Sequence, residues 1–440
     1  METSKLPSVW NLLRSRQPWL LAAVIFLGRM AYFAYWGTLL EIDSLGYLKF
    51  QAALYHPPLY SGFSWAALQI GGVVDAIIVA QCLLYSLSAG LLVGRWGKTG
   101  RMQLLIAILL ALEPCSGKLA CTVMAETVFL SLLMLAWLAL PKLRAVNWRQ
   151  ACLASAWIGL LMGLAYQTRY AAPVFVVAVI CWMLAIRLPW RRMLMGTAVI
   201  LLAFQCALLP LRMYYQAHFG TLQTNAFSSL SLWNTSAYLH PGSAVAIAPD
   251  TGFERFLTCF PDADYEIYHT WHTNQMFHDS LAFQRFVNDQ RLGTADILDA
   301  AGSSGATAWK LLLASPMRHL REFVWPNVKR PFSVQDHIHS NLLPMQMDEQ
   351  ILFHRHKLHF YWPAAWGAIF GLLLLSSGLQ LRYRKRLPAH AGLLILSCWL
   401  YLAGIAGLAV IFLRFVYVLA PLVVLALGIQ AEALLKRKSE

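Results

Sequence analysis

Residues 18–37, PWLLAAVIFLGRMAYFAYWG, form the first of many apolar runs in this 440-residue chain. A helix needs roughly 20 such residues to cross a hydrocarbon core of about 30 Å. Ten runs of this kind occur, at about 18–37, 71–94, 102–117, 120–140, 151–168, 171–187, 193–211, 361–381, 390–411 and 415–434. The chain is 58% hydrophobic and only 13% charged, whereas about 25% of a typical soluble domain is charged. The sequence therefore predicts an all-α polytopic membrane protein with about ten transmembrane helices.

The charged residues are distributed unevenly over the predicted loops. If the N-terminus is inside, the inner segments hold 19 Lys and Arg against three acids, and the rest of the chain holds 16 bases and 18 acids. Cytoplasmic loops of membrane proteins carry such an excess of Lys and Arg. The net charge of +14 is therefore a topology signal and not a nucleic-acid-binding signal. We expect both termini in the cytoplasm and a first span that is retained, because no small-residue cleavage site follows it.

The predicted spans divide the chain into three parts. Residues 1–211 form an N-terminal transmembrane module with a long first outer loop, 38–70, whose amphipathic spacing predicts interfacial helices. Residues 212–360 form one extracytoplasmic mixed domain that holds 11 of the 13 histidines and has helical apolar spacing over 280–292 and 304–323. Residues 361–440 supply the C-terminal transmembrane helices.

The first outer loop concentrates chemically active side chains. Its central part, residues 41–60, reads EIDSLGYLKFQAALYHPPLY. Asp43 is the key carboxylate, either as an N-cap of an amphipathic helix or as a reactive group. Glu41 is less attractive because it lies nearer the end of the first span. Pro57-Pro58 ends the first helix of the loop and stiffens the chain beside His56.

Further charged groups lie where predicted spans end. Four bases lie at predicted outer ends: Lys118, Arg169, Arg212 and Arg414. A single arginine there extends to lipid headgroups, but several bases beside an acidic loop suit an anion such as phosphate. Lys49 and His56 can join them. Glu126, less than two turns into the fourth run, is expected to face a polar cavity or to pair with a base.

Two other features carry less information. Residues 113–118, EPCSGK, predict an outer hairpin between the third and fourth spans, and Cys115 and Cys121 beside it are able to pair, although free thiols are favoured. The histidine groups at 269–278 and 337–359 have neither cysteines nor clustered acids at zinc-site spacing. We therefore assign no metal ligands.

Several short motifs follow one another along the chain. They are Asp43-x-x-x-Tyr47, Pro57-Pro58-Leu-Tyr60, Glu126, Arg169 after Gly163-Leu-Ala, Phe219-Gly220, Ser315-Pro316 and Arg414-Phe-Val-Tyr417-x-x-x-Pro421. In this order over ten spans, the chain resembles the GT-C fold glycosyltransferases that use polyprenyl-phosphate sugars, such as aminoarabinose and arabinofuranosyl transferases and protein O-mannosyltransferases. It departs from the family pattern at His56, where lysine often precedes the Pro-Pro pair, and in the polar domain inserted after the seventh span.

The resemblance implies an inverting glycosyltransferase that moves a pentose or hexose, such as arabinose, from a polyprenyl monophosphate to a hydroxyl group. The acceptor would be a glycolipid, a glycan or a protein such as pilin. The implied roles are general base for Asp43, donor phosphate binding for Lys49, His56, Arg169 and Arg414, and orientation of sugar or acceptor for Tyr47, Tyr60 and Glu126. No cofactor is required, although a divalent cation can share the phosphate charge. The site would face the periplasm from a bacterial inner membrane.

Two other functions fit the same composition. An oligosaccharide ligase with a polyprenyl-diphosphate donor would place its key residues in the large polar domain, which is rich in histidine. A lipid or solute transporter would explain ten spans with intramembrane acids, but it predicts related halves and interrupted helices at the middle of the membrane. Because the polar residues gather at predicted outer span ends, the transferase is favoured.

Overall fold

The computed structural model describes residues 15–40, 42–48, 57–144, 147–220, 222, 309–310, 312–325, 363–408 and 416–436. Within these ranges the regular secondary structure is helical, and the one β-type contact is an isolated bridge between Leu39 and Thr122. Five helices in these ranges are long and apolar enough to cross a bilayer, and the bent pair α6 (Gly100–Leu112) and α7 (Pro114–Ala120) adds a sixth if it is a single span. The described part of the chain is thus all-α and belongs to a membrane protein, and the count of ten spans stays a prediction.

The helices follow the predicted apolar runs. Besides α6 and α7, the described elements are α2 (Gln17–Trp36), α3 (Ile42–Leu48), α4 (Pro58–Gly71), α5 (Asp75–Trp96), α8 (Glu126–Trp137), η1 (Leu140–Arg144), α9 (Trp148–Tyr166), α10 (Ala172–Ala185), α11 (Trp190–Phe219), α18 (Pro316–His319), η3 (Leu320–Val324), α21 (Pro363–Arg382), α22 (Ala389–Leu408) and α24 (Leu419–Lys436). Each of the ten runs overlaps one helix of at least 12 residues. Two further helices, α3 and α4, lie in the predicted first outer loop, where the sequence predicts helices.

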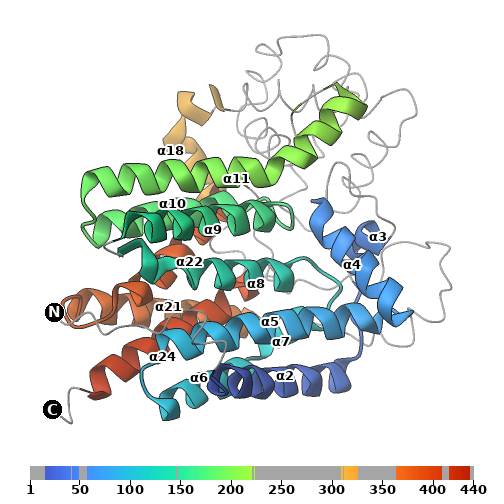
Figure 1. Ribbon diagram of the computed structural model, residues 1–440, viewed down its shortest axis with the longest axis horizontal. Coiled ribbons are helices and arrows are strands. Elements are labelled where there is room, and N and C mark those ends of the chain that lie inside the picture. The colour runs from blue at the N-terminus through green and yellow to red at the C-terminus, as the bar shows by residue number, and fades with distance from the viewer. Residues whose placement is uncertain are drawn as a thin grey trace.

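Different elements meet at the two ends of the bundle (Figure 1). At one end the start of α2, the turn between α5 and α6, and the last turns of α24 meet. Gln17 is hydrogen-bonded to Gln103, and the carboxylate of Glu432 accepts the backbone N–H groups of Lys98 and Thr99 at 2.6 to 3.0 Å. Helices α3 and α4 lie at the opposite end. This grouping agrees with the predicted loop pattern, and which end faces the cytoplasm stays a prediction.

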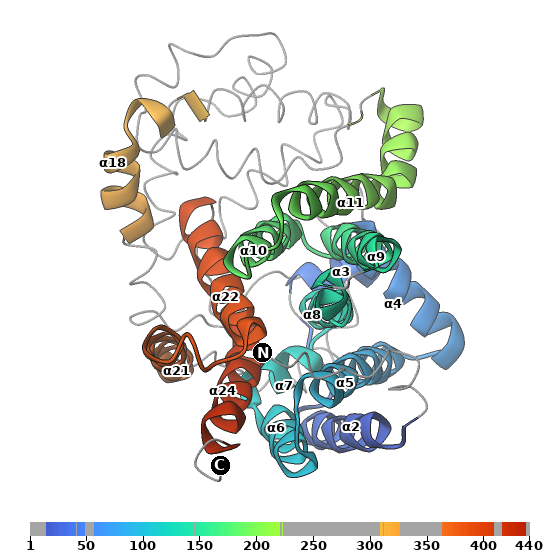
Figure 2. The same ribbon diagram turned by 60° about the vertical axis from the view of Figure 1, so that its left-hand side comes forward.

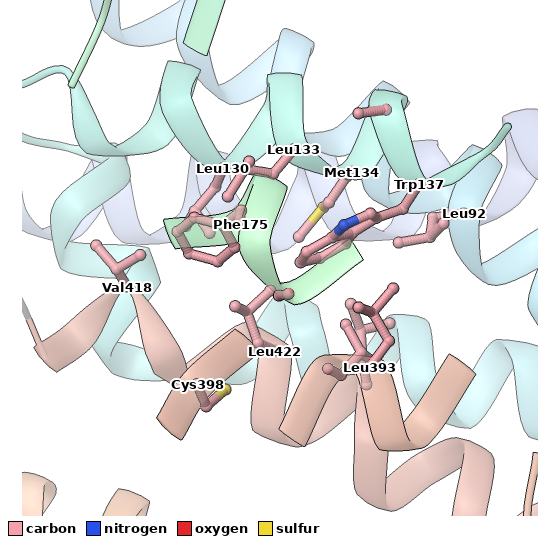
Figure 3. Packing of buried hydrophobic residues seen from close by; sticks show 14 of the residues in the cluster. Leu92, Leu130, Leu133, Met134, Trp137, Phe175, Leu393, Cys398, Val418 and Leu422 are labelled. Atoms are coloured by element: carbon pink, nitrogen blue, oxygen red, sulfur yellow. The ribbon is translucent and has the colours of Figure 1, made fainter. Parts of the chain in front are cut away.

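Helix α8 is the central helix of the bundle (Figure 2). In Figure 3 its residues Leu130, Leu133, Met134 and Trp137 lie against Phe175 of α10 and against side chains of α5, α22 and α24. Of the residues in the span that begins with α8, 83% are buried, compared with 22% of those in α2. The first residue of α8 is therefore surrounded by protein and not by lipid.

Helices α9 and α11 approach each other closely because two glycines face the contact. A Cβ atom at Gly159 or Gly163 would collide with the backbone of α11. Small residues four positions apart allow such close approach between membrane helices. Beyond them, Gln167 Nε2 donates to the Ala207 carbonyl at 2.7 Å. These contacts fix the end of α9 that leads to Arg169.

The segment after α6 differs from the prediction. The sequence predicts an outer hairpin over residues 113–118, but this stretch forms the short helix α7, which is bent by 61° from α6 and buried. The Glu113 carboxylate caps α7 by accepting the N–H groups of Cys115 at 2.5 Å and Ser116 at 2.8 Å. Pro114 has no N–H group to satisfy. The capped, proline-led helix can therefore be buried where a loop could not. Cys115 and Cys121, whose pairing the sequence leaves open, are free thiols.

A buried arginine that the sequence analysis did not single out holds this bend. Arg29 of α2 is fully buried. Its guanidinium donates to the carbonyls of Leu110 at 2.5 Å and Glu113 at 3.1 Å and to Ser116 Oγ at 2.7 Å, and it lies over the ring of Tyr85. The guanidinium thus satisfies carbonyls that the broken helix leaves open. A charge within an apolar run was the available signal, because such charges need partners.

The predicted polar domain, 212–360, is described only in part. Helix α11 continues across the predicted boundary to Phe219, and Gly220 ends it in a left-handed conformation with φ of 68°. Helix α18 lies within the predicted helical stretch 304–323, and η3 begins within it and ends one residue beyond it. The other predicted helix, 280–292, lies outside the described residues. The three-part division therefore stays a prediction.

Candidate functional site

The chain after α2 is joined to the chain before α8. The Leu39 N–H donates to the Cys121 carbonyl at 2.8 Å, and the Val123 N–H donates to the Leu39 carbonyl at 3.0 Å. In α3, Ser44 Oγ donates to the Val123 carbonyl at 2.8 Å. These bonds hold α3, whose second residue is Asp43, against the segment that leads into α8.

Helix α4 is joined to the connection between α9 and α10. Pro57 and Pro58 begin it, and the Leu59 N–H donates to the Gln167 carbonyl at 2.9 Å. Arg169 follows two residues later. Three segments that are distant in sequence, those of α3, α4 and the α9–α10 connection, are thereby brought to the start of α8.

Glu126 and Arg169 form an ion pair at this point. Glu126 is the first residue of α8 and is fully buried, and the Arg169 side chain is 17% exposed; Nη1 of Arg169 contacts Oε1 of Glu126. Glu126 Oε2 has no hydrogen-bond partner among the described residues. The helix N-terminus also favours a carboxylate. Of the two expectations for Glu126, a polar cavity or a basic partner, the second is confirmed.

Two tyrosines of the predicted site pack beside the start of α8. Tyr47 and Tyr60 are buried and meet edge to face, with ring centres 4.7 Å apart. The Tyr60 hydroxyl donates to Gln81 Oε1 at 2.9 Å, and Gln81 Nε2 donates to the carbonyls of Ala120 at 2.8 Å and Thr122 at 2.7 Å. Gln81 of α5 therefore ties α4 to the segment between α7 and α8.

Burial keeps the phenols at this end in their protonated form. Burial raises the pKa of Tyr60 well above its ordinary value of 10.0, and the neighbouring Tyr47 and Glu126 act in the same direction. Burial likewise raises the pKa of Tyr170 well above that value, with Tyr215 as the next cause. Near neutral pH these groups can donate hydrogen bonds but cannot act as bases.

The predicted site residues fall into four groups. Four lie at the α3–α4 end of the bundle: Tyr47, Tyr60, Glu126 and Arg169. For Asp43 the backbone of α3 is described and the side chain is not, while Lys49, His56 and Arg414 lie outside the described residues. Lys118 was expected at the surface, but it is buried on helix α7. Its Nζ lies 6.0 Å from the centre of the Trp36 ring of α2.

Sequence reasoning missed two residues at this end. Gln81 is an amide inside an apolar run, which was a usable signal because such groups bond to other segments of a membrane bundle. Tyr170 packs edge to face on Tyr166, with ring centres 5.1 Å apart, and no local pattern predicts this contact. The described residues contain no group of three or more potential metal ligands, and the histidine groups at 269–278 and 337–359 lie outside them.

No protein-family model, no curated protein and no solved structure matches this chain.

The tie through Gln81 leads to a stability prediction. Tyr60→Phe leaves Gln81 Oε1 without its donor in a buried position, which costs about 1–3 kcal/mol. We expect a lower midpoint in thermal unfolding of the purified protein followed by near-ultraviolet circular dichroism. Tyr35→Phe is the control because Tyr35 is 78% exposed. Equal midpoints for the two variants would contradict the role of the hydroxyl.

The raised pKa of Tyr60 adds a pH dependence to this prediction. Its pKa is higher in the folded state than in the unfolded state, so its contribution is complete below pH of about 10 and is lost as the pH rises further. The wild type should lose more stability than Tyr60→Phe on alkaline titration.

Proposed function

We propose that the protein is an inverting glycosyltransferase of the GT-C type, which transfers a sugar from a polyprenyl monophosphate to an acceptor hydroxyl outside the cytoplasm. The observation that carries the proposal is the attachment of α3, the helix of Asp43, to the segment that leads into the ion pair of Glu126 and Arg169. A lipid-linked donor suits this arrangement, because its chain can stay in the bilayer while its phosphate and sugar reach charged groups at one end of the bundle.

In the proposed reaction Asp43 takes the proton of the acceptor hydroxyl as its oxygen attacks the anomeric carbon. The bond from the anomeric carbon to the phosphate oxygen breaks, and its electron pair leaves with polyprenyl phosphate. Attack opposite the phosphate inverts the anomeric configuration. Cations stabilise the departing phosphate, and those assigned to this role are Lys49, His56, Arg169 and Arg414. A divalent cation can share the charge.

The ion pair has a defined place in this proposal. A guanidinium carries five N–H donors, so Arg169 can bind a phosphate oxygen while one donor remains on Glu126. Glu126, which is fully buried, fixes the orientation of the guanidinium. Tyr60 donates its hydroxyl to Gln81, so we assign it the positioning of α4 and assign Tyr47 the packing of α3.

A transporter is the second candidate, because α6 and α7 form a broken helix beside the buried Arg29. Transporters build substrate sites at such interruptions. Here, however, the guanidinium of Arg29 is bonded to the carbonyls of Leu110 and Glu113 and to Ser116. Polar groups at the interruption are thus bonded to the protein itself rather than to a substrate. This favours the transferase. The histidines that a diphosphate-dependent ligase would use lie at 337–359, outside the described residues.

Mass spectrometry of the lipids that co-purify with the full chain tests the proposal. We expect a polyprenyl-monophosphate sugar. Its level should be lower in Arg169→Ala, because that variant removes a guanidinium that binds the phosphate. This result would also identify the sugar. A polyprenyl diphosphate carrying an oligosaccharide would favour the ligase instead. Equal donor content in wild type and Arg169→Ala would remove Arg169 from the phosphate site.

A further inference from the structure

Helix α4 has the reverse of the pattern expected for a helix at a water-exposed surface. Such helices bury an apolar stripe and expose polar groups. The buried stripe of α4 includes three hydroxyl side chains, those of Tyr60, Ser61 and Ser64. Its outward face carries Trp65, which is 58% exposed, and Ile70, which is 90% exposed, with the exposed amide Gln69 between them. Apart from this amide, the outward face suits apolar surroundings.

The composition around α4 agrees with such surroundings. Residues 57–74 contain no charged side chain. Val73, which follows the helix, is also exposed, as are Val79 and Leu83 on α5. Because α5 is long and apolar enough to cross a bilayer, its exposed side chains face acyl chains. Helix α4 packs directly on α5, so its outward face adjoins that lipid-facing surface.

Part of the backbone at both ends of α4 is bonded within the protein. Pro57 and Pro58 have no N–H group, and the Leu59 N–H is bonded to the Gln167 carbonyl. At the other end Gly72 has φ of 70°, and its N–H donates to the Leu68 carbonyl at 2.8 Å. An unsatisfied backbone group in the bilayer core costs several kcal/mol. These bonds lower the cost of placing the ends of α4 in an apolar medium.

We infer that α4 is immersed in the bilayer, with the face that carries Trp65 and Ile70 against phospholipid acyl chains and its hydroxyl stripe against the protein. The helix then sets the depth of the candidate site, because Leu59 is bonded to Gln167 and Tyr60 is tied through Gln81 to the segment before α8. The inference rests on exposure, charge and backbone bonding, and it does not depend on the proposed function.

Photo-crosslinking in native membranes tests this inference. A benzophenone amino acid is introduced singly into the full chain at Trp65, Ala66 or Ile70, and adducts are identified by mass spectrometry. Leu83 on α5 is the lipid-facing control, and Lys385, exposed between α21 and α22, is the water-facing control. Three positions on one face guard against the failure of a single variant to fold.

We expect adducts with phospholipid acyl chains at all three positions, in yields comparable to Leu83 and several-fold above Lys385. Yields as low as those at Lys385 would overturn the inference. Cross-links to other parts of the same chain would overturn it as well, because protein would then cover this face. Adducts with polyprenyl lipid alone would also do so, since the face would then hold the donor chain and not the bilayer.

Discussion

Asp43→Asn should abolish sugar transfer while leaving donor binding intact. The amide keeps the shape of the side chain but cannot take the acceptor proton, and loss of a general base typically lowers a rate about 10²–10⁴-fold. The measurement is the release of polyprenyl phosphate from a polyprenyl-phosphate sugar by the purified protein, with donor affinity measured separately. Turnover near the wild-type level would show that Asp43 is not the base.

The matched control for this variant is Asp75→Asn. Asp75 is the first residue of α5, at the same end of the bundle, and it accepts a hydrogen bond from Thr38 Oγ1. An asparagine can still accept that bond. We therefore expect Asp75→Asn to retain turnover, and an equal loss in both variants would point to a general effect of charge at this end.

Glu126→Gln should strongly destabilise the fold. The change leaves the Arg169 guanidinium, 17% exposed, without its carboxylate, and removing one partner of a buried ion pair costs about 3–5 kcal/mol. The measurement is the free energy of unfolding in denaturant for the protein in mixed micelles. Glu113→Gln is the control, because that side chain caps α7 through hydrogen bonds that an amide can partly keep.

A double variant separates the ion pair from general packing effects. In Glu126→Gln/Arg169→Met no buried charge is left unpaired, so the double variant should be more stable than Glu126→Gln alone. If the two changes instead added independently, the ion pair would not be the source of the loss.

The apolar runs predicted the helices well because a segment within a bilayer must satisfy its own backbone, and a helix does so locally. The prediction failed at residues 113–118 for a reason of the same kind. Proline and glycine there are typical of a turn, but Glu113 caps the segment and Arg29, from a distant span, satisfies the preceding carbonyls. That second contribution is tertiary and has no local pattern.

The candidate site was predictable as a set of residue types but not as a set of contacts. The cost of burying a carboxylate made a basic partner for Glu126 a reasonable expectation, but its identity as Arg169 depends on how α8 and α9 pack. The role of Gln81 depends on the approach of α4 and of the α7–α8 segment to α5. Neither spacing nor propensity along the chain contains that information.

The proposed function requires that the protein break the bond between sugar and polyprenyl phosphate. To test this directly, the purified protein is placed in liposomes with a polyprenyl-phosphate sugar labelled in both the sugar and the lipid, together with a membrane extract as the source of acceptor. We predict equal amounts of free polyprenyl phosphate and of acceptor carrying the sugar in inverted configuration, both lost in Asp43→Asn. Movement of the intact donor across the bilayer without release of polyprenyl phosphate, at equal rates in the wild type and Asp43→Asn, would contradict it.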